Sequence, residues 1–474
     1  MLHALALAAL LGQAPPDAGG VGGAVEALPA VVAGLPVDGG TPLFPYPIDV
    51  RTLKNGLQVV LVPTGPGGLT AYYTLVRVGS RNEVEEGHTG FAHFFEHMMF
   101  RGTDAYSSEK YSQTLQGAGV NNNAETSDDF TLFTNYGPSE ALPTVITVEA
   151  DRFQHLKYSK EGFQTEAKAV LGEYNKDVAD PEFALDEAMH KAAFRKSTYR
   201  HTTMGFLKDV QHMPQQYDYS LKFFKRWYVP SNTTIFVVGD FSPAQLFPLI
   251  EQAYGDWRGT VSAVKIPREP AQHQQTTLTV RWSTQTLPRV MVGFHAPSAG
   301  TDLKAAAIQN LLGPYLFGPA SVLYKSLVLD SHQAVALQSW YGDHREPALF
   351  DFVATAREEK DLQPILQVIG QTLARLQAEG PDPKLLASVK SNQHYGMLMA
   401  FETPAAIAGA LAGAAAPTGD PASLNALARA MDEVTPADVQ AFAAQYLVAK
   451  NQTVVMLRPP AAVAAAAARK GGGR

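Results

Sequence analysis

The chain has 474 residues, 46% of them hydrophobic, which is enough to bury a large core and more than one ordinary domain needs. Its formal charge of -7 comes from acids and bases interspersed along the sequence, so no basic stretch indicates binding to nucleic acid. It has no cysteine, which excludes disulfides and leaves His, Asp and Glu as the ligands for any metal site.

The N-terminus has the outline of a secretory signal. It reads MLHALALAALLGQAPPDAGG, an apolar run from Leu2 to Leu11 followed by small residues. We therefore expect residues 1–20 to be a signal peptide and the protein to be exported, periplasmic or extracellular; the alternative is an Ala-rich leader on a cytoplasmic protein. The run is too short to span a membrane, and no later stretch is long and charge-free enough to do so.

Composition and an internal repeat divide the rest of the chain. Residues 21–46, rich in Gly, Pro, Ala and Val, are typical of a linker or flexible arm. Further on, MPQQYDYSLKFFKRWYVPSNTTIFVVGDFSP has the same order of helix, turn and apolar strand as VTPADVQAFAAQYLVAKNQTVVMLRPP. We therefore expect an α+β protein of two homologous units at residues 47–257 and 275–460, with a linker at 258–274 and a disordered tail at 461–474.

The segment HFFEHMMFRGT places two histidines and a glutamate within five positions. On a helix, at about 100° per residue, His93, Glu96 and His97 share one face. The opposite face is apolar and consists of Phe91, Phe94, Phe95, Met98 and Met99. Because His93 and His97 are one turn apart, both imidazoles can reach one ion at about 2.0–2.1 Å, while Glu96 can take a proton. This is H-x-x-E-H, the reverse of the thermolysin-type motif.

The competing interpretation of this motif is a solvated polar face that happens to carry two histidines. At these residue frequencies H-x-x-E-H arises by chance in roughly two chains of this length in a hundred, so a second element is needed. GFQTEAKAVLGEYNKD supplies one, because Glu166 and Glu173 lie two helical turns apart at the edge of an apolar stripe. Half-buried carboxylates need a partner or a metal, so beside the histidines we favour a metal site.

Together these segments resemble the M16 (pitrilysin-like, or inverzincin) zinc metallopeptidases. GHTGFAHFFEHMMFRGT resembles the zinc helix of that family, and EAKAVLGEYNKD resembles its downstream acidic helix. The resemblance implies one zinc ion per chain, held by His93, His97 and Glu173. It also implies that Glu96 is the general base, acting on a water whose pKa the ion lowers, and that Glu166 orients a ligand.

The same resemblance implies the fold and the substrate. NNNAETSDDFTLF resembles the edge strand along which the family binds peptides by β-augmentation, which assigns Asn123 and Ala124 to substrate binding. The family's units are α/β sandwiches, each a mixed, mainly antiparallel sheet with helices packed on one face, and two of them form a half-shell. We therefore expect a zinc endopeptidase that hydrolyses peptides or unfolded segments inside a clamshell chamber.

The sequence departs from the family in its second half. Complete family enzymes carry an Arg and a Tyr, seven residues apart, that steady the substrate; the matching positions here are Val328 and Val335, which cannot donate a hydrogen bond. We therefore predict a hetero-dimer with a second M16-like subunit that supplies the Arg and Tyr. A homodimer is the weaker option, since both copies lack the pair. Four nearby polar residues are out of register and are assigned to packing or surface: Tyr324, His332, Tyr341 and Arg345.

Two other functions stay open from the sequence. A non-catalytic scaffold or core subunit would be expected to have lost its ligands, whereas His93, Glu96, His97 and Glu173 are all present. A metal-binding module without hydrolysis would fit the missing Arg and Tyr. Metal content measured together with peptide turnover distinguishes these functions.

Overall fold

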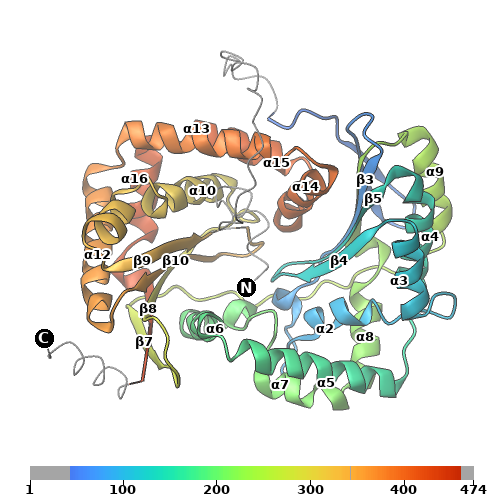
Figure 1. Cartoon of the computed structure of the whole chain (residues 1–474), viewed down its shortest axis with the longest axis horizontal. Coiled ribbons are helices and arrows are strands. Elements are labelled where there is room, and N and C mark those ends of the chain that lie inside the picture. Colours follow the sequence, from blue (N-terminus) through green and yellow to red (C-terminus); the bar gives the residue numbers. More distant parts are fainter. Residues whose placement is uncertain (1–42, 342, 461–474) are drawn as a thin grey trace, which may run out of the picture.

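The structure, a computed structural model, describes residues 43–341 and 343–460 (Figure 1). The predicted signal peptide, most of the predicted arm and the predicted tail lie outside the described residues. Figure 1 shows two β-sheets, one in each half of the chain, with helices around both. Within the described ranges, no helix is both long and apolar enough to cross a membrane.

The N-terminal sheet has the strand order β1-β2-β6-β3-β5-β4. All neighbours in it are antiparallel except β2 and β6, which run parallel. Its strands are β1 (Asp49–Thr52), β2 (Gln58–Pro63), β3 (Leu69–Val76), β4 (Asn121–Thr126), β5 (Thr131–Pro138) and β6 (Thr233–Gly239). Since β4 is the last strand in the order, one of its edges is not paired with another strand of the sheet, and its backbone groups there can bind an added strand.

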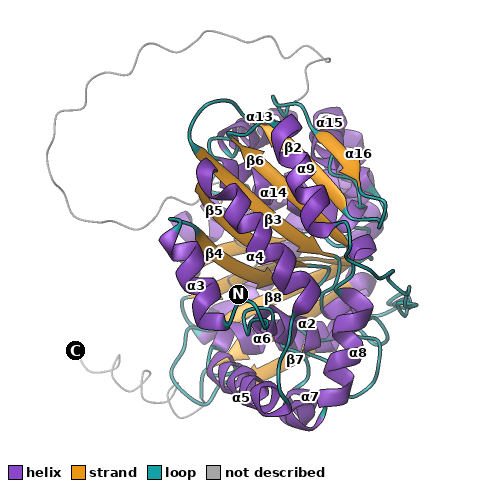
Figure 2. Ribbon diagram, turned by 90° about the vertical axis from the view of Figure 1, so that its right-hand side faces the viewer, coloured by secondary structure: helices purple, strands orange, loops and turns teal. Residues whose placement is uncertain are grey.

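Helices of the same half cover one face of this sheet. They are α2 (Phe91–Met98), α3 (Ser108–Gly117), α4 (Leu142–His155), α5 (Lys160–Asp177), α7 (Leu207–His212), α8 (Tyr217–Trp227) and α9 (Pro243–Tyr254). Figure 2 shows α4 and α9 in front of the strands. Side chains along each strand point alternately to the two faces of the sheet. Val59 and Leu61 of β2 pack with these helices, whereas Val60 and Val62 belong to the hydrophobic core on the other face.

The C-terminal sheet repeats this arrangement. Its order is β7-β11-β8-β10-β9, which matches the N-terminal sheet strand for strand once β1 is set aside. The strands are β7 (Thr276–Arg281), β8 (Arg289–Ala296), β9 (Ala334–Trp340), β10 (Ala348–Ala356) and β11 (Gln452–Arg458). The parallel pair, β7 with β11, occupies the place of β2 with β6. The internal repeat read from the sequence is therefore present in the fold, while the exact domain limits stay a prediction.

The two halves exchange one helix each. The helices of the C-terminal half are α10 (Leu303–Phe317), α11 (Val322–Tyr324), α12 (Leu362–Glu379), α13 (Pro383–Met399), α14 (Pro404–Thr418), α15 (Ser423–Glu433) and α16 (Pro436–Tyr446). Of these, α14 packs on β3 and β6 of the N-terminal sheet, while α6 (Pro181–Ala193) of the N-terminal half packs on β7, β8 and β11 (Figure 1). Each half's own helices thus cover one sheet face, as predicted, and the other half covers the opposite face.

Candidate metal centre

Helix α2 carries the H-x-x-E-H motif and is fixed at its first turn. Gly90 precedes the helix with φ of +90°, and a Cβ there would lie 2.8 Å from the carbonyl oxygen of Met204, so glycine is required. The buried carboxylate of Glu83 accepts hydrogen bonds from the backbone N–H groups of Gly90 and Ala92, both at 2.8 Å. These bonds satisfy helix N–H groups that have no partner within the helix, so Glu83 holds α2 in place.

The structure brings His93, His97 and Glu173 together. The potential ligand atoms of these three residues all lie within 4.8 Å of one another. Glu173 Oε2 lies 3.3 Å from His97 Nε2 and 3.7 Å from His93 Nε2. Two atoms held at about 2.0–2.1 Å by one tetrahedral ion are roughly 3.4 Å apart, so this spacing fits a zinc ion. Two imidazoles and one carboxylate also form a donor set that leaves the fourth position of such an ion open.

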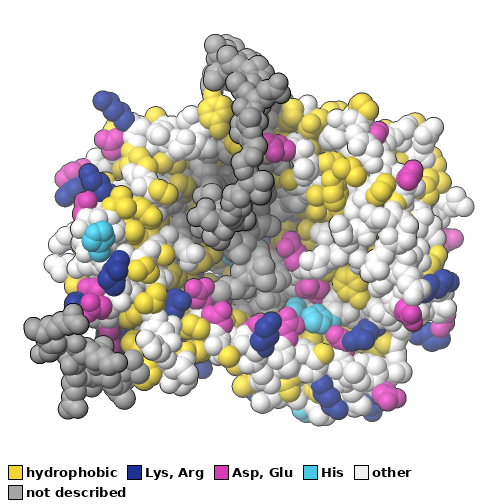
Figure 3. All heavy atoms as spheres, viewed as in Figure 1, with side chains coloured by type: hydrophobic (Ala, Val, Ile, Leu, Met, Phe, Trp, Pro, Cys, Tyr) yellow, Lys and Arg dark blue, Asp and Glu magenta, His cyan; other side chains and the backbone are white. Residues whose placement is uncertain are grey.

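The electrostatic surroundings of Glu173 favour its ionised form. The hydrogen bond with His97 holds the pKa of Glu173 below its ordinary value, and the charges of both histidines act in the same direction against the cost of burial. His93 is buried, whereas the side chain of Glu173 is 40% exposed. The centre therefore opens toward solvent on its Glu173 side. Figure 3 shows acidic side chains gathered beside a histidine on this face.

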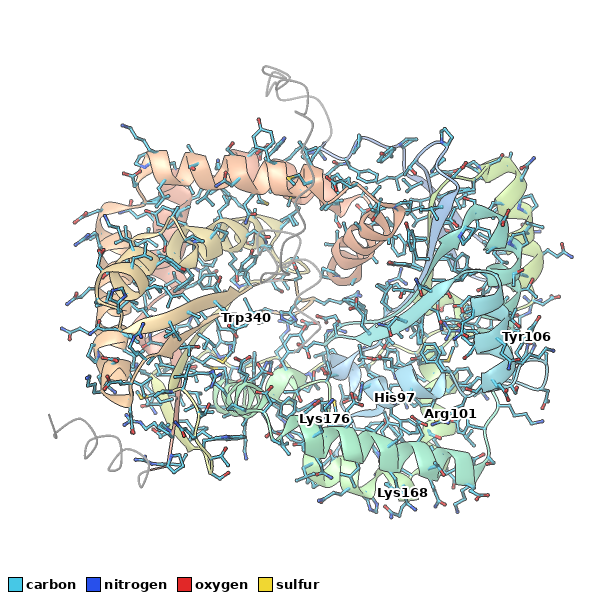
Figure 4. The ribbon with its side chains drawn as sticks, viewed as in Figure 1. His97, Arg101, Tyr106, Lys168, Lys176 and Trp340 are labelled. Carbon is cyan, nitrogen blue, oxygen red and sulfur yellow. The ribbon has the colours of Figure 1, made fainter. Side chains whose placement is uncertain are left out.

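Glu166 lies behind His97 and not among the ligand atoms. Its Oε1 is 3.0 Å from His97 Nδ1, and its other oxygen contacts the guanidinium group of Arg101. Because an ionised carboxylate can only accept, His97 carries its proton on Nδ1 and presents the lone pair of Nε2 toward Glu173. The contact of Arg101 with Glu166 was not predicted from the sequence. Its position four residues after His97, in the turn that follows α2, could have indicated that it lies near the site (Figure 4).

Glu96 lies beside the centre and is held by the edge strand. The hydroxyl of Thr126, at the end of β4, donates to Glu96 Oε2 at 2.6 Å. Burial raises the pKa of Glu96 above its ordinary value, and this hydrogen bond opposes the rise. Thr126 was not identified from the sequence, although strand alternation places it on the same face as Ala124, toward α2. Burial, with the charge of Glu96, also raises the pKa of Glu125 to about 6.

Asn123 and Ala124 lie on β4, as expected from the sequence. Asn123 is opposite Thr134 of β5 and Ala124 is opposite Phe133, so their far side is the sheet edge. The structure thus places both residues on the strand that holds the Glu96 carboxylate. Their role in substrate binding stays a prediction.

The two valines at the family's Arg and Tyr positions differ in their surroundings. Val328, in the short π-helical stretch Lys325–Asp330, packs against the hydrophobic core, whereas Val335 on edge strand β9 is 39% exposed. Tyr341, one of the polar residues assigned to packing or surface, lies with its ring against Gly313. A backbone N–H, and not the side chain, links Arg345 to Asp129.

Two sequence models match most of the described chain. Residues 62–206 match a model described as "Insulinase (Peptidase family M16)", and residues 216–393 match one described as "Peptidase M16 inactive domain". The first match contains every predicted site residue. The chain belongs to peptidase family M16. Its two halves correspond to the family's N-terminal and C-terminal domains.

Named relatives and solved structures agree with this assignment. The zinc protease PqqE of Helicobacter pylori is 27% identical over 368 residues, which are 76% of this chain and 82% of that protein. A protease structure from Helicobacter pylori has a TM-score of 0.82 at 25% identity and covers 87% of this chain and 100% of that one. The periplasmic protease PqqL of Escherichia coli has a TM-score of 0.71 at 18% identity and covers 88% of this chain but 48% of that one. The M16 fold, two homologous α+β units in a half-shell, is thereby confirmed.

Proposed function

We propose that this chain is the catalytic half-shell of a zinc endopeptidase that hydrolyses peptides or unfolded segments. The observation that carries the proposal is the grouping of two imidazoles and the Glu173 carboxylate beside Glu96, next to the free edge of β4. The zinc protease name of the Helicobacter pylori relative supports the same chemistry.

The geometry supports a role for each of these residues. A zinc ion held by His93, His97 and Glu173 would polarise a peptide carbonyl and lower the pKa of a water molecule. Glu96 accepts the proton of the water whose oxygen attacks the carbonyl carbon, and returns it to the nitrogen of the leaving amine as the C–N bond breaks. Thr126 fixes one oxygen of Glu96, so the other is available for this transfer.

Two residues outside the ligand set would keep the ligands oriented. Glu166 accepts a hydrogen bond from Nδ1–H of His97 and so fixes the tautomer and the ring orientation of that histidine. Arg101 in turn holds the second oxygen of Glu166. We infer that Glu166 and Arg101 act on the reaction through His97 and do not touch the substrate.

The edge strand supports an extended substrate. We propose that the backbone of Asn123 and Ala124 pairs with a peptide added to β4, which places the peptide beside Thr126 and Glu96. A folded protein seldom offers a free extended segment, so this mode of binding selects peptides and unfolded chains.

The C-terminal half supports the proposal of a partner. Neither Val328 nor Val335 can donate a hydrogen bond to a developing oxyanion. The chain also spans about half of PqqL. We propose a hetero-dimer with a second M16-like subunit that contributes the Arg and Tyr, a homodimer being the weaker option. The apolar N-terminal run supports export as the proposed location.

The missing Arg and Tyr favour one second candidate, a non-catalytic zinc-binding scaffold subunit. Purified full-length chain, alone and co-expressed with an M16-like protein that carries the Arg and Tyr, separates the two candidates. We expect one zinc per chain in both samples, and faster cleavage of a quenched fluorescent peptide in the co-expressed sample. Bound zinc without cleavage in either sample would favour the scaffold, and equal cleavage rates in both would remove the need for a partner.

A further inference from the structure

A cavity that contains no residue of the metal centre lies between three segments of the N-terminal half. They are the last turn of α4, the C-terminal part of α8 and residues 256–262, which follow α9. Both helices face the viewer in Figure 2. The volume of the cavity is about 800 Å³, within the range of about 300–1,000 Å³ that is usual for small-molecule sites. We call it the α8 cavity.

The wall that residues 256–262 form is held in a fixed position. The backbone N–H of Val261 donates to the hydroxyl oxygen of Ser231 at 2.9 Å. Gly259 has φ of +135°, and a Cβ there would lie 2.6 Å from Val229 Cγ1, so the backbone lies directly against that valine. The α8 cavity is therefore already formed without a ligand, which lowers the entropy cost of binding.

Aromatic rings form the floor of the α8 cavity. Phe224 is half-buried, and its ring stacks on that of Tyr228 with 5.3 Å between the ring centroids. The buried ring of Phe153 lies 6.2 Å from Tyr228 and 6.0 Å from Trp257, again between centroids. This floor suits a ligand with an apolar part that can pack on the ring of Phe224.

Two lysines of the α8 cavity have no partner. Lys222 and Lys225 are three residues apart on α8, so both side chains lie on one side of the helix. Both are exposed, and neither forms an ion pair or a hydrogen bond within the described ranges. Asp256 is the one acid among the described residues that line the cavity, and its Oδ1 is 3.0 Å from Nη2 of Arg258. The two lysines are therefore available to bind a negative charge.

Trp257 adds a hydrogen-bond donor to the same cavity. It is 5% exposed, and its indole N–H donates to no acceptor in the part of the chain that the structure describes. An indole N–H can only donate, and a buried donor without an acceptor is unfavourable. An oxygen atom of a ligand would satisfy it. Together with the lysines, this donor favours an anionic ligand over a neutral or a cationic one.

The floor of the α8 cavity also contacts the helix of the metal centre. Phe95 of α2, the neighbour of Glu96, stacks on Phe224 at 5.8 Å and lies 5.6 Å from Tyr228, between ring centroids. A ligand on Phe224 would therefore be separated from Phe95 by one ring. No residue of β4 is among the described residues that line the cavity, so its ligand would not be the peptide added to that strand.

We propose that the α8 cavity binds an organic anion, a molecule with an apolar body and a carboxylate, phosphate or sulfonate group. The apolar body packs on Phe224, and the anionic group meets Lys222, Lys225 and the N–H of Trp257. An inorganic anion would leave the aromatic floor unused, and a neutral apolar molecule would leave the lysines unused. This inference goes beyond the proposed function and does not depend on it.

Titration of the full-length chain with anilinonaphthalene sulfonate tests the proposal directly. This probe combines an aromatic body with one negative charge, and its fluorescence rises in an apolar site, which gives a Kd. We expect Lys222→Gln combined with Lys225→Gln to weaken binding about five- to tenfold. Lys160→Gln combined with Lys168→Gln removes the same charge from exposed positions of α5 and should leave the Kd unchanged.

A pair of substitutions at Thr260 changes the charge of the cavity without removing any contact. Thr260 is exposed and lines the cavity, so neither new side chain should disturb the fold. Thr260→Glu should weaken binding of the probe at least about threefold, because its carboxylate repels the sulfonate. Thr260→Gln, which has nearly the same size and no charge, should bind the probe as the wild type does.

Competing molecules separate the two parts of the ligand. Dodecanoate has an apolar chain and an anionic group, dodecyltrimethylammonium has the same chain with a positive charge, and inorganic phosphate has no apolar part. At equal concentrations below micelle formation, we expect dodecanoate alone to displace the probe. Absence of probe binding would overturn the proposal. Displacement by the cation or by phosphate as effective as that by dodecanoate, or equal Kd values for the two double-lysine variants, would overturn it as well.

Discussion

The two halves share a strand order, but the helix that follows β3 in the N-terminal half differs from the helix that follows its counterpart β8 in the C-terminal half. In the N-terminal half, β3 leads to α2, which buries Phe91, Phe94 and Phe95 on one side and presents His93 and His97 on the other. In the C-terminal half, β8 leads to α10, whose residues are apolar on nearly every face and mostly buried. The same M16 unit therefore serves as a scaffold in both halves, and we propose that the chemistry depends on the one helix that has a polar face.

The edge strands differ in the same way. In the N-terminal half, the Thr126 hydroxyl at the end of β4 connects the edge to Glu96 of helix α2. Edge strand β9 has the exposed Val335 and leads into the loop that carries Asp343 and His344. One edge therefore lies beside the proposed metal centre, whereas the other contributes its loop to the contact between the halves.

Separating the halves should have the largest effect. Fragments 43–265 and 266–460 would each lack the helix that covers one face of their sheet, since α14 and α6 are exchanged. We expect each fragment alone to be insoluble or unfolded, because a bare apolar sheet face is exposed. Co-expression of both should restore a soluble complex. Circular dichroism and size-exclusion chromatography check this, and a folded monomeric fragment would show that the exchange is dispensable.

The contact between the halves should depend on pH through His344. Burial opposes its protonation, but the hydrogen bond to Asp129 and the charges of Asp128 and Asp343 raise its pKa to about 9. The raised pKa means that this stabilisation is complete below the unfolded value, about 6.5, and is lost as pH rises through about 9. Urea unfolding should show His344→Gln to be less stable by up to about 3 kcal/mol at pH 6, and much less so at pH 9.5.

A histidine outside the contact serves as the control for that experiment. His273 is exposed, so His273→Gln should follow the wild-type stability at every pH. If the difference between wild type and His344→Gln stayed constant from pH 6 to 9.5, protonation of His344 would not stabilise the contact.

Removal of the carboxylate that orients His97 should weaken zinc binding, which is a smaller effect than the two above. Glu166→Gln replaces the carboxylate that accepts from Nδ1, and we expect zinc to bind about 10–100-fold more weakly. Competition with a chelator at fixed pH measures this. Glu161→Gln, exposed on the same helix, is the matched control and should bind zinc as the wild type does. Equal affinities for all three chains would leave Glu166 without an orienting role.

The smallest expected effect is at the start of α2. Glu83→Gln keeps one acceptor but turns an NH₂ group toward a backbone N–H, which should lower the free energy of unfolding by about 1–2 kcal/mol. Denaturant titration measures the change, with the exposed Glu86→Gln as control. Unchanged stability of Glu83→Gln would mean that the helix does not need this acceptor.

Periodicity made part of the site predictable. His93, Glu96 and His97 could be placed on one helix face because their relation is local, and the spacing of Glu166 and Glu173 identified a second helix. The supporting residues were not predictable, because each acts through a contact between distant segments. Thr126 reaches Glu96 from a strand thirty residues later, and no pattern in either segment records the pairing.

The fold was predictable to a similar depth. The internal repeat indicated two units of the same fold, because segments with the same order of helix, turn and strand are expected to pack in the same way. It did not indicate the exchange of α6 and α14. The small residues of α14 (PAAIAGALAGAAAPT) indicate close packing, yet the partner of a packed helix depends on the chain's path and not on the helix itself.

We propose above all that α2 and Glu173 form a hydrolytic zinc centre in which Glu96 moves the proton. The most direct test compares wild type and Glu96→Gln, each co-expressed with the M16-like partner, for zinc content and for cleavage of a quenched peptide. We predict one zinc per chain in both, with cleavage reduced by at least about 10²–10⁴-fold in the variant. Equal cleavage by the two proteins, or absence of zinc from the wild type, would contradict the proposed function.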